Sequence, residues 1–460
     1  MELFSMRWCL MVTMGMIVLG GWHSPVQAME LVVSGQTITL KADKVPLHSI
    51  LRRLSATGIA VKVDPSVNPM VTADFRNRSI QEALDQILGD NSHVLFWKKD
   101  RRGEIALSRI VIYRDGLMDA ASPLAASAGL DIEKDPETGN IYVKNKILMQ
   151  FRPPVDSKRI RAILKKFGAG IKLFHEGLGV YEVTLPDGSR MADALAALGE
   201  VSGGGLVEPD YAYKTPVPLQ YATDHQVPRE ENSSQAVGSS PVAVLDSGLD
   251  PNFLSQDLNL ASLDALMPEE AISDTVGHGT QMALIASGQI DPMGGENEAF
   301  LNPVLSVRAF DDNGYTSNAI LLKGIDFAVE NGAKVLSLSW GSETDSAFLK
   351  QAMAYARSRG LHIVAAAGNV PTGKPVYPAA YDTVLSVAAL APDGKAWDKS
   401  NYGDFVDVAA PGFAQLPVGH KGDPGTYAGT SIATAYVAGK LAAYLRENPG
   451  QKIDIEKLLE

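Results

Sequence analysis

Three short motifs in the C-terminal half of the chain carry the side chains needed for nucleophilic catalysis. An aspartate, a histidine and a serine occur in that order: Asp246 in Asp-Ser-Gly, His278 in Gly-His-Gly-Thr and Ser431 in Gly-Thr-Ser-Ile-Ala. A serine hydroxyl is a weak nucleophile until an adjacent base takes its proton, and an imidazole serves best when a carboxylate fixes its tautomer. The three residues are therefore candidates for the nucleophile, the general base and the group that orients the base.

Each of these residues also has an ordinary structural interpretation. An aspartate at a strand end is often a helix cap, and a lone histidine is often structural. Ser431 could be a simple N-cap, and Asn369, which follows a glycine, could be a turn residue. Asp-Ser-Gly or His-Gly-Thr alone occurs by chance in many proteins, so each motif taken singly leaves these interpretations open.

Apolar runs place these residues at the ends of strands and at the start of a helix. The strands are 241–245, ending at Asp246, then 334–341, and then 361–367, ending at Gly368-Asn369. An apolar helix extends from Ser431 to about Glu447. Strands that alternate with helices predict an α/β unit with a mostly parallel sheet, in which sites lie at the carboxyl ends of the strands.

Together, the motifs and their neighbours resemble the subtilisin-like serine proteases over residues 241–445. Supporting matches are Tyr377-Pro378-Ala379, Ser400-Asn401-Tyr402-Gly403 and Ala409-Ala410-Pro411-Gly412. The order aspartate, histidine, serine is that of subtilisin itself. The resemblance implies a serine endopeptidase that cleaves polypeptides through an acyl-enzyme, with Asp246, His278 and Ser431 as catalytic residues.

The resemblance also assigns the surroundings of the nucleophile. The side-chain amide of Asn369 and the backbone N–H of Ser431 would form an oxyanion hole. An extended substrate would pair with Ser339, Trp340 and Gly341. The pocket for the residue before the scissile bond would be walled by Ala365, Ala366, Ala367 and Gly368, with room for a sizeable apolar or neutral group.

The sequence departs from the family pattern at two places that bear on the site and its cofactors. After Ser431 the usual Met-Ala-Ser-Pro-His is replaced by residues 432–436, Ile-Ala-Thr-Ala-Tyr, which removes no catalytic group. The segment before Asp246 is short and polar, so the family's calcium-binding arm is not evident; calcium is left open and no other cofactor is expected. Cys9 is the single cysteine and no His-Glu-x-x-His motif occurs, so no metal site is assigned.

Two smaller α+β units are predicted upstream. Residues 29–113 resemble the short N-terminal domain of secretins and TonB-dependent receptors in Val45-Pro46-Leu47, Val63-Asp64-Pro65 and Ile80-Gln81-Glu82-Ala83-Leu84. This resemblance implies docking to an envelope protein; an unrelated α+β spacer is the alternative.

Residues 141–213 follow the order strand, helix, strand, strand, helix, strand, which is a ferredoxin-like plan. They resemble the inhibitor-type propeptides of subtilases, most clearly in 147–151, 179–181 and 207–211. In that family the last strand leads an extended tail into the protease cleft, where it adds a strand to exposed edges.

The remaining segments are typical of a leader and of linkers. Residues 1–28 carry Arg7, an apolar run and Val26-Gln27-Ala28, as in a secretory signal peptide; an uncleaved anchor is the alternative. No later stretch is long and apolar enough to span a bilayer. Linkers are expected at 114–140 and at 214–240, the second with the maturation site before a catalytic unit at 241–460. An exported protein, periplasmic or secreted, is therefore predicted.

Charge excludes one class of function and favours docking between the units. The chain has 41 Lys and Arg against 53 Asp and Glu, a net charge of −12, so a basic nucleic-acid-binding surface is not expected. Residues 238–460 are acidic, whereas 29–115 and 141–213 have a small basic excess. The leading hypothesis is a self-processed protease zymogen. The alternative is an envelope interaction protein that carries a latent or inactive protease unit.

Overall fold

The described residues fall into the three predicted units. The computed structural model describes residues 30–34, 37–56, 59–64, 67, 69–89, 91–99, 105–114, 116, 118, 121–124, 129–152, 156–217, 219–221, 240–268, 272–295, 301–419, 424–454 and 458. The predicted signal peptide and Cys9 lie outside these residues, as does most of the predicted maturation linker.

The first unit has two small sheets around its own core. Its elements are β1 (Glu30–Ser34), β2 (Thr37–Pro46), α1 (Leu47–Ala56), β3 (Ala60–Val63), β4 (Met70–Ser79), α2 (Ile80–Leu88), β5 (Ser92–Lys99), β6 (Ile105–Tyr113) and β7 (Ser122–Pro123). The sheet orders are β1-β2-β4 and β5-β6-β3-β7. Helix α2 begins at a capping box, in which the Ser79 hydroxyl accepts from the Glu82 N–H and donates to the Glu82 carboxylate. Apolar side chains of α1 and α2 fill the space between the strands.

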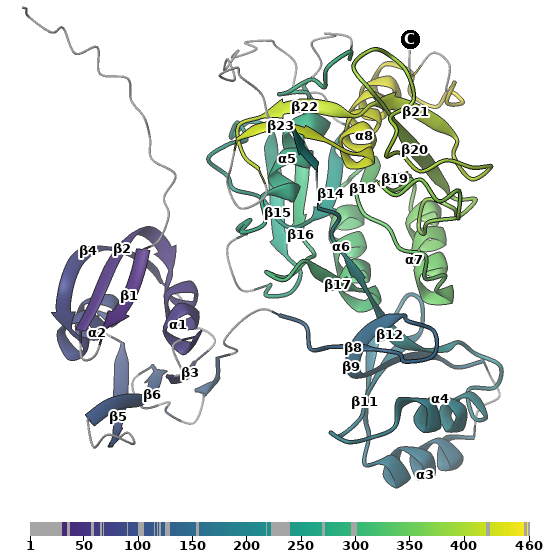
Figure 1. The fold of residues 1–460 in the computed structure, drawn as a ribbon. Coiled ribbons are helices and arrows are strands. Elements are labelled where there is room, and N and C mark those ends of the chain that lie inside the picture. The colour runs from purple at the N-terminus through teal and green to yellow at the C-terminus, as the bar shows by residue number, and fades with distance from the viewer. Residues whose placement is uncertain are drawn as a thin grey trace, which may run out of the picture.

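The second unit packs two helices on one face of an antiparallel sheet (Figure 1). Its elements are β8 (Ile132–Lys134), β9 (Ile141–Gln150), α3 (Ser157–Phe167), β10 (Gly170–His175), β11 (Val180–Thr184), α4 (Met191–Gly199) and β12 (Val207–Lys214). In the sheet the strands lie in the order β10-β11-β9-β12. Along the chain, from β9 to β12, the elements follow the order strand, helix, strand, strand, helix, strand. Asp156 caps the start of α3, and Gly168 ends it with φ 62°.

The linker predicted at 114–140 is wrong in its extent. Strand β7 pairs with β3 of the first unit, and β8 pairs with β9 of the second. Both short strands lack the apolar alternation that marks a strand in sequence, because each is an edge strand held mainly by backbone hydrogen bonds.

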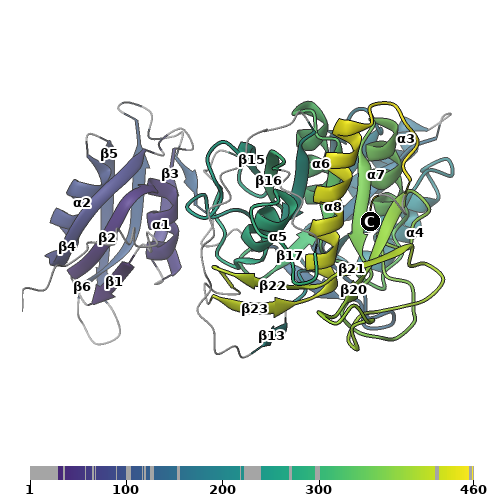
Figure 2. The same cartoon turned by 90° about the horizontal axis from the view of Figure 1, so that it is seen from above.

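The third unit is built on a seven-stranded parallel sheet. Its elements are β14 (Val242–Asp246), β15 (Asn259–Asp264), α5 (His278–Ala286), β16 (Val304–Arg308), β17 (Tyr315–Ser317), α6 (Asn318–Glu330), β18 (Val335–Leu338), α7 (Ala347–Ser358), β19 (His362–Ala366), β20 (Val384–Leu390), β21 (Val408–Pro411), β22 (Phe413–Leu416), β23 (Gly425–Ala428) and α8 (Thr430–Glu447). The order is β15-β16-β14-β18-β19-β20-β21, with every neighbouring pair parallel. Helices α5 and α8 pack on one face and α6 and α7 on the other (Figure 2).

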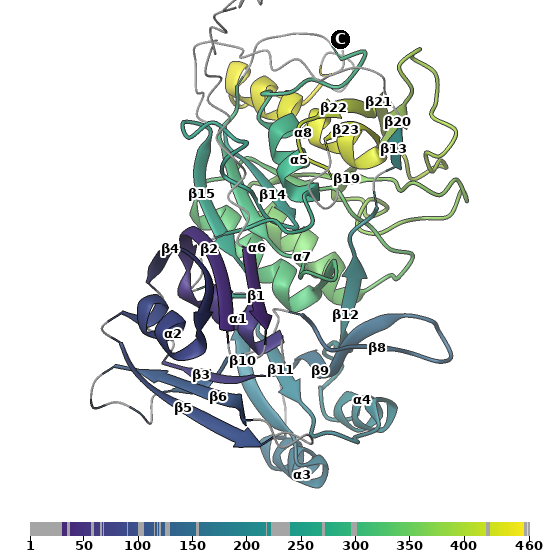
Figure 3. The same ribbon diagram turned by 60° about the vertical axis from the view of Figure 1, so that its left-hand side comes forward.

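The second and third units are joined through their backbones. The end of β12 pairs with β17, so the antiparallel sheet of the second unit continues onto the third. Figure 3 shows β12 extending from the second unit toward the third. A short strand, β13 (Leu219–Tyr221), then pairs with β23. The predicted linker at 214–240 thus begins with ordered chain that lies against the third unit.

Helix α8 is buried along almost its whole length. Helices α8 and α5 approach each other so closely that a Cβ added at Gly439 would lie 2.7 Å from the carbonyl oxygen of Ala286. Asn302 donates to both carbonyls, of Gly439 at 3.0 Å and of Ala286 at 3.2 Å, and so fastens the two helices together. Among the described residues, no helix combines the length and the apolar character that a membrane span requires.

We expect Gly439→Ala to lower the thermal stability of the third unit. The clash with backbone costs about 1–3 kcal/mol, which exceeds the gain of about 1 kcal/mol from better helix propensity. Thermal unfolding of the full chain measures the effect. Gly199→Ala in α4 is the matched control, because a Cβ there meets nothing within 4 Å; it should leave the transition of the third unit unchanged. An unchanged transition in Gly439→Ala would contradict the close packing of α5 and α8.

Candidate active site

The elements that carry the predicted catalytic residues converge at the carboxyl end of the parallel sheet. Asp246 is the last residue of β14, His278 is the first residue of α5, and Ser431 is the second residue of α8. Gly277, immediately before His278, has φ 87°, and a Cβ there would lie 2.1 Å from the carbonyl oxygen of Gly419. Only glycine therefore allows the chain to turn into α5 at this point.

Asp246 and His278 form a buried hydrogen-bonded pair. Asp246 Oδ1 lies 2.7 Å from His278 Nδ1, and the side chains are 1% and 0% exposed. The same Oδ1 accepts from the backbone N–H of Ser247 at 2.7 Å. Burial lowers the pKa of His278, but the charge and hydrogen bond of Asp246 and the charge of Asp274 raise it, and the balance lies above the ordinary value of 6.5. The imidazole is thus held with Nδ1 toward the carboxylate.

The hydroxyl of Ser431 is hydrogen-bonded elsewhere. Ser431 Oγ donates to the backbone carbonyl of Ser339 at 3.0 Å. His278 Nε2 is buried and has no hydrogen-bond partner among the described residues. The predicted contact between Ser431 and His278 is therefore not formed in this structure. A serine hydroxyl moves between rotamers by rotation about one bond, so Ser431 Oγ can leave Ser339 without movement of the backbone.

The amide of Asn369 is oriented by a residue that sequence reasoning missed. Asn369 Oδ1 accepts from the backbone N–H and from the hydroxyl of Thr430, each at 2.9 Å. With the oxygen occupied, the amide presents Nδ2 as its free end, close to Gly429, where a Cβ would lie 3.4 Å from Nδ2. The arrangement leaves an N–H donor beside Ser431. Thr430 adjoins the nucleophile in sequence, but nothing in the sequence pattern indicates that it contacts Asn369.

Asp274 organises the loop that carries the histidine, and it too was missed. Its carboxylate accepts from the hydroxyl of Ser247 at 2.9 Å and from the N–H groups of Gly277 at 2.7 Å and Thr280 at 2.8 Å. These bonds tie the residue that follows Asp246 to the start of α5. An aspartate four residues before a histidine, at the start of a helix, was the only signal available in the sequence.

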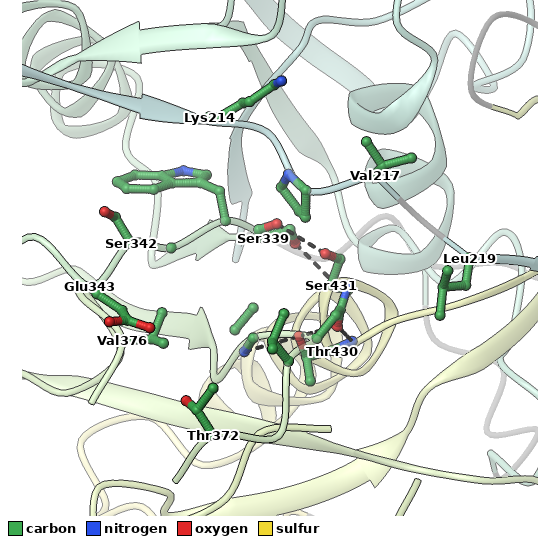
Figure 4. A pocket seen from close by; sticks show the side chains of 17 residues that line it. Lys214, Val217, Leu219, Ser339, Ser342, Glu343, Thr372, Val376, Thr430 and Ser431 are labelled. Atoms are coloured by element: carbon green, nitrogen blue, oxygen red, sulfur yellow. Dashed lines mark hydrogen bonds between the residues drawn. The ribbon is translucent and has the colours of Figure 1, made fainter. Parts of the chain in front are cut away.

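Five of the seven predicted substrate-binding residues line a cavity of about 380 Å³ beside Ser431 (Figure 4). They are Ser339, Trp340, Gly341, Ala366 and Gly368. Ala365 and Ala367 are wholly buried and do not line it, so their assignment is wrong. For Ala365 the reason is strand geometry: successive side chains of β19 point to opposite faces, and Ala366 is the one that reaches the cavity. Ala367 follows the end of the strand.

The chain that follows β12 runs through this cavity. Lys214, Pro216, Val217 and Leu219 line it together with Ser431 and Asn369. Upstream, Thr215 donates its N–H to the carbonyl of Gly314 at 2.8 Å, and downstream Leu219 pairs with Ala428. Residues 214–221, called the tail below, therefore have backbone partners on both sides of the candidate nucleophile.

The described residues include no group of three or more His, Cys, Asp or Glu side chains that could hold a metal ion. Calcium also binds backbone carbonyls and waters, so this finding leaves calcium open, as the sequence does.

Comparisons with known proteins identify the families of the second and third units. Residues 239–457 match the Subtilase family, and residues 130–210 match the Fervidolysin N-terminal prodomain. The chain is 34% identical over 228 residues to Subtilisin Savinase of Lederbergia lenta, covering 49% of this chain and 82% of that protein. It therefore belongs to the subtilase family of serine proteases, and it carries a prodomain of the fervidolysin type.

Two further proteins are similar over more of the chain. The Thermophilic serine proteinase of Bacillus sp. (strain AK1) is 29% identical over 344 residues, which are 69% of this chain and 82% of that protein. The crystal structure of fervidolysin from Fervidobacterium pennivorans, a keratinolytic enzyme related to subtilisin, aligns with a TM-score of 0.52 at 23% identity. The alignment covers 71% of this chain and 58% of that structure, and it shows the subtilisin-like α/β fold.

We expect Asp274→Asn to lower the pKa of His278. The carboxylate of Asp274 favours the protonated imidazole, so removing its charge makes the imidazole lose its proton at lower pH. Titration of the His278 ring resonances by NMR measures the change. Asp312→Asn is the control, because Asp312 accepts from Thr275 in the same loop without influencing the pKa of His278. An unchanged or raised pKa in Asp274→Asn would contradict the assigned electrostatics.

Proposed function

We propose that the chain is a serine endopeptidase in which Asp246, His278 and Ser431 form the catalytic triad. The observation that carries the proposal is the buried pair of Asp246 and His278 at 2.7 Å, with His278 Nε2 unpartnered among the described residues. His278 begins α5, which packs against α8, the helix that carries Ser431. In this reaction Ser431 Oγ turns from Ser339 to His278, gives its proton to Nε2 and bonds to the substrate carbonyl carbon. His278 then protonates the leaving amine as the C–N bond breaks, and water hydrolyses the acyl-enzyme by the same proton transfers.

Two hydrogen-bond donors are placed to stabilise the negative charge that develops on the carbonyl oxygen. They are Asn369 Nδ2, which Thr430 orients, and the backbone N–H of Ser431. Ser431 also lies in the first turn of the 18-residue helix α8, where the helix dipole favours negative charge. Because these donors are fixed before the substrate binds, little reorganisation is needed at the transition state.

We further propose that the protein is made as a zymogen that cuts itself between residues 214 and 240. The ferredoxin-like unit at 141–213 would be the inhibitor and folding unit. Support comes from two of its carboxylates, which cap helices of the protease unit. Glu208 accepts from the N–H of Ala347 at 3.0 Å, at the start of α7, and Asp210 accepts from the N–H of Ala319 at 3.1 Å, at the start of α6. Such caps stabilise both helices and fix the docked position.

The proposal also covers export and the N-terminal unit. A signal peptide at 1–28 would direct the chain to the periplasm or the medium. Residues 29–113 would dock to an envelope protein as a secretin-like short domain, and they would leave with the prodomain on complete processing. The alternative, a latent protease carried by an envelope module, is not favoured; the paired Asp246 and His278 and the oriented Asn369 support a catalytic role for the third unit.

We expect Ser431→Ala to lower kcat/KM for a fluorogenic peptide by about 10⁴-fold or more, because the variant lacks the proposed nucleophile. Ser358→Ala at the exposed end of α7 is the matched control and should match the wild type. The wild-type protein should also lose both N-terminal units on purification, whereas Ser431→Ala stays at full length. N-terminal sequencing and intact mass measure this. Equal peptidase activity in wild type and Ser431→Ala would refute the peptidase assignment, and an uncut wild type would refute the zymogen.

We expect release of the prodomain to be slower at pH 5.5 than at pH 8. Burial raises the pKa of Asp210 to about 7, more than the bonds from Ser317 and Ala319 lower it. Asp210 therefore holds its proton more tightly when docked. The affinity of the docked prodomain therefore rises as the pH falls below 7, by up to about tenfold per pH unit. This added affinity is lost as the pH rises through 7.

The measurement is the rate at which activity appears after processing at each pH, with all aliquots assayed at one pH. Asp210→Asn removes the titrating group and should flatten the dependence. Asp187→Asn, at an exposed carboxylate of the same unit, should leave it unchanged. A release rate in Asp210→Asn with the wild-type pH dependence would contradict the role of Asp210.

A further inference from the structure

Tyr213, the penultimate residue of β12, is inserted into the core of the protease unit. Its side chain is 0% exposed and belongs to the same hydrophobic cluster as α6, α7 and the strands between them. The ring stacks on Trp340 at 5.4 Å between centroids and 29° between planes, and Phe310 contacts Trp340 edge-on at 5.9 Å. The protease unit thus has a deep aromatic pocket that a residue from another unit fills.

The floor of this pocket carries a hydrogen-bond acceptor for a phenol. Tyr213 donates its hydroxyl to Asn318 Oδ1 at 2.8 Å, and both side chains are buried. Burial raises the pKa of Tyr213 well above its ordinary value, so the hydroxyl keeps the proton that it donates. A phenylalanine could fill the same volume but would offer no donor to this acceptor.

The protease unit itself orients the acceptor. Asn318 Nδ2 donates to the hydroxyl of Ser346 at 3.0 Å, and Ser346 also accepts from the N–H of Leu349 at 3.1 Å. Because the amide nitrogen is engaged with Ser346, the amide oxygen faces the pocket. All three residues lie in α6, α7 or the cap of α7, so the bond from Asn318 to Ser346 is made within the protease unit. While the prodomain is docked, the Ser346 hydroxyl also donates to Glu208 at 2.9 Å.

The backbone of Tyr213 enters along a route that a substrate can follow. Tyr213 pairs with Thr316 of β17, and the chain continues through Thr215 to Pro216 and Val217 beside Ser431. An extended peptide that occupies the same edge of β17 presents the third residue before Pro216 to the aromatic pocket.

We propose that Asn318 is a specificity-determining residue that makes this pocket prefer tyrosine over phenylalanine in substrates. The inference rests on the proposed peptidase activity and assigns a substrate class to that site: polypeptides with a tyrosine three residues before the one whose carbonyl Ser431 attacks. The physical reason is that phenylalanine leaves the buried amide oxygen of Asn318 without a donor. The free-energy cost of that unpaired oxygen is larger than the net stabilisation from one hydrogen bond.

The experiment uses the processed wild-type enzyme and p-nitroanilide peptides of sequence X-Lys-Thr-Leu, in which X is Tyr, Phe or Ala. A second series, X-Lys-Thr-Pro-Leu, places X one residue farther from the scissile bond and tests the register. We expect kcat/KM to be about ten- to a hundredfold higher for Tyr than for Phe in the first series, and lower again for Ala, with a smaller ratio of Tyr to Phe in the second. Equal values for Tyr and Phe in the first series would overturn the inference. If the enzyme hydrolyses none of these peptides and no protein substrate, the proposed function itself has failed.

A variant of Asn318 tests whether this residue causes the preference for Tyr over Phe. Asn318→Leu replaces the amide by an apolar side chain of the same size, and the ratio of Tyr to Phe in kcat/KM should fall to about one or below. The ratio does not depend on how much of the variant folds. Asn331→Leu, at the exposed far end of α6, is the matched control and should keep the wild-type ratio. A preference for Tyr that survives in Asn318→Leu would overturn the assignment to Asn318.

Discussion

Asp246 and His278 meet at 2.7 Å with almost no solvent contact, and the rest of the site is arranged around that contact. An ionised carboxylate is costly to bury, so it is held by the Ser247 N–H as well as by the imidazole. Asp274 then fixes Ser247 and the first turn of α5 relative to each other. The parallel sheet supplies the geometry, because β14 ends where α5 begins on the same edge. Loss of that register would separate the pair and leave a buried charge without its partner.

The tail places a second constraint on the same edge. It extends the antiparallel sheet of the prodomain through β12 and β17 and then pairs with β23, so its backbone is held before and after Ser431. Glu208 and Asp210 cap two helices of the protease unit, and Tyr213 fills an aromatic pocket of the same unit. The proposed inhibition, folding role and substrate preference would all depend on this one strand. The Ser431 hydroxyl is bonded to Ser339 while residues of the tail line the cavity beside it.

Much of this arrangement follows from local pattern. The strand that ends at Asp246, the helix that begins beside Ser431 and the helix from Ser157 to Phe167 were all predictable, because apolar periodicity and caps act within a few residues. Edge strands such as β7 and β8 were not, because their stability comes from backbone pairing with distant segments rather than from their own side chains. Ala365 and Ala367 were misassigned for a related reason: the sequence shows an apolar strand but not which of its faces the cavity lies on.

By itself, the sequence determined which side chains are available for chemistry, in what order they occur, and on which kind of element each one lies. It also indicated that a propeptide-like unit precedes the protease unit. Only the tertiary structure decided the contacts between segments that lie tens to hundreds of residues apart. These include Thr430 with Asn369, Ser431 with Ser339, and Tyr213 with Asn318. Such pairs depend on how the crossover connections order the strands and on which face of the sheet each helix covers. Neither is visible in the local periodicity of the sequence.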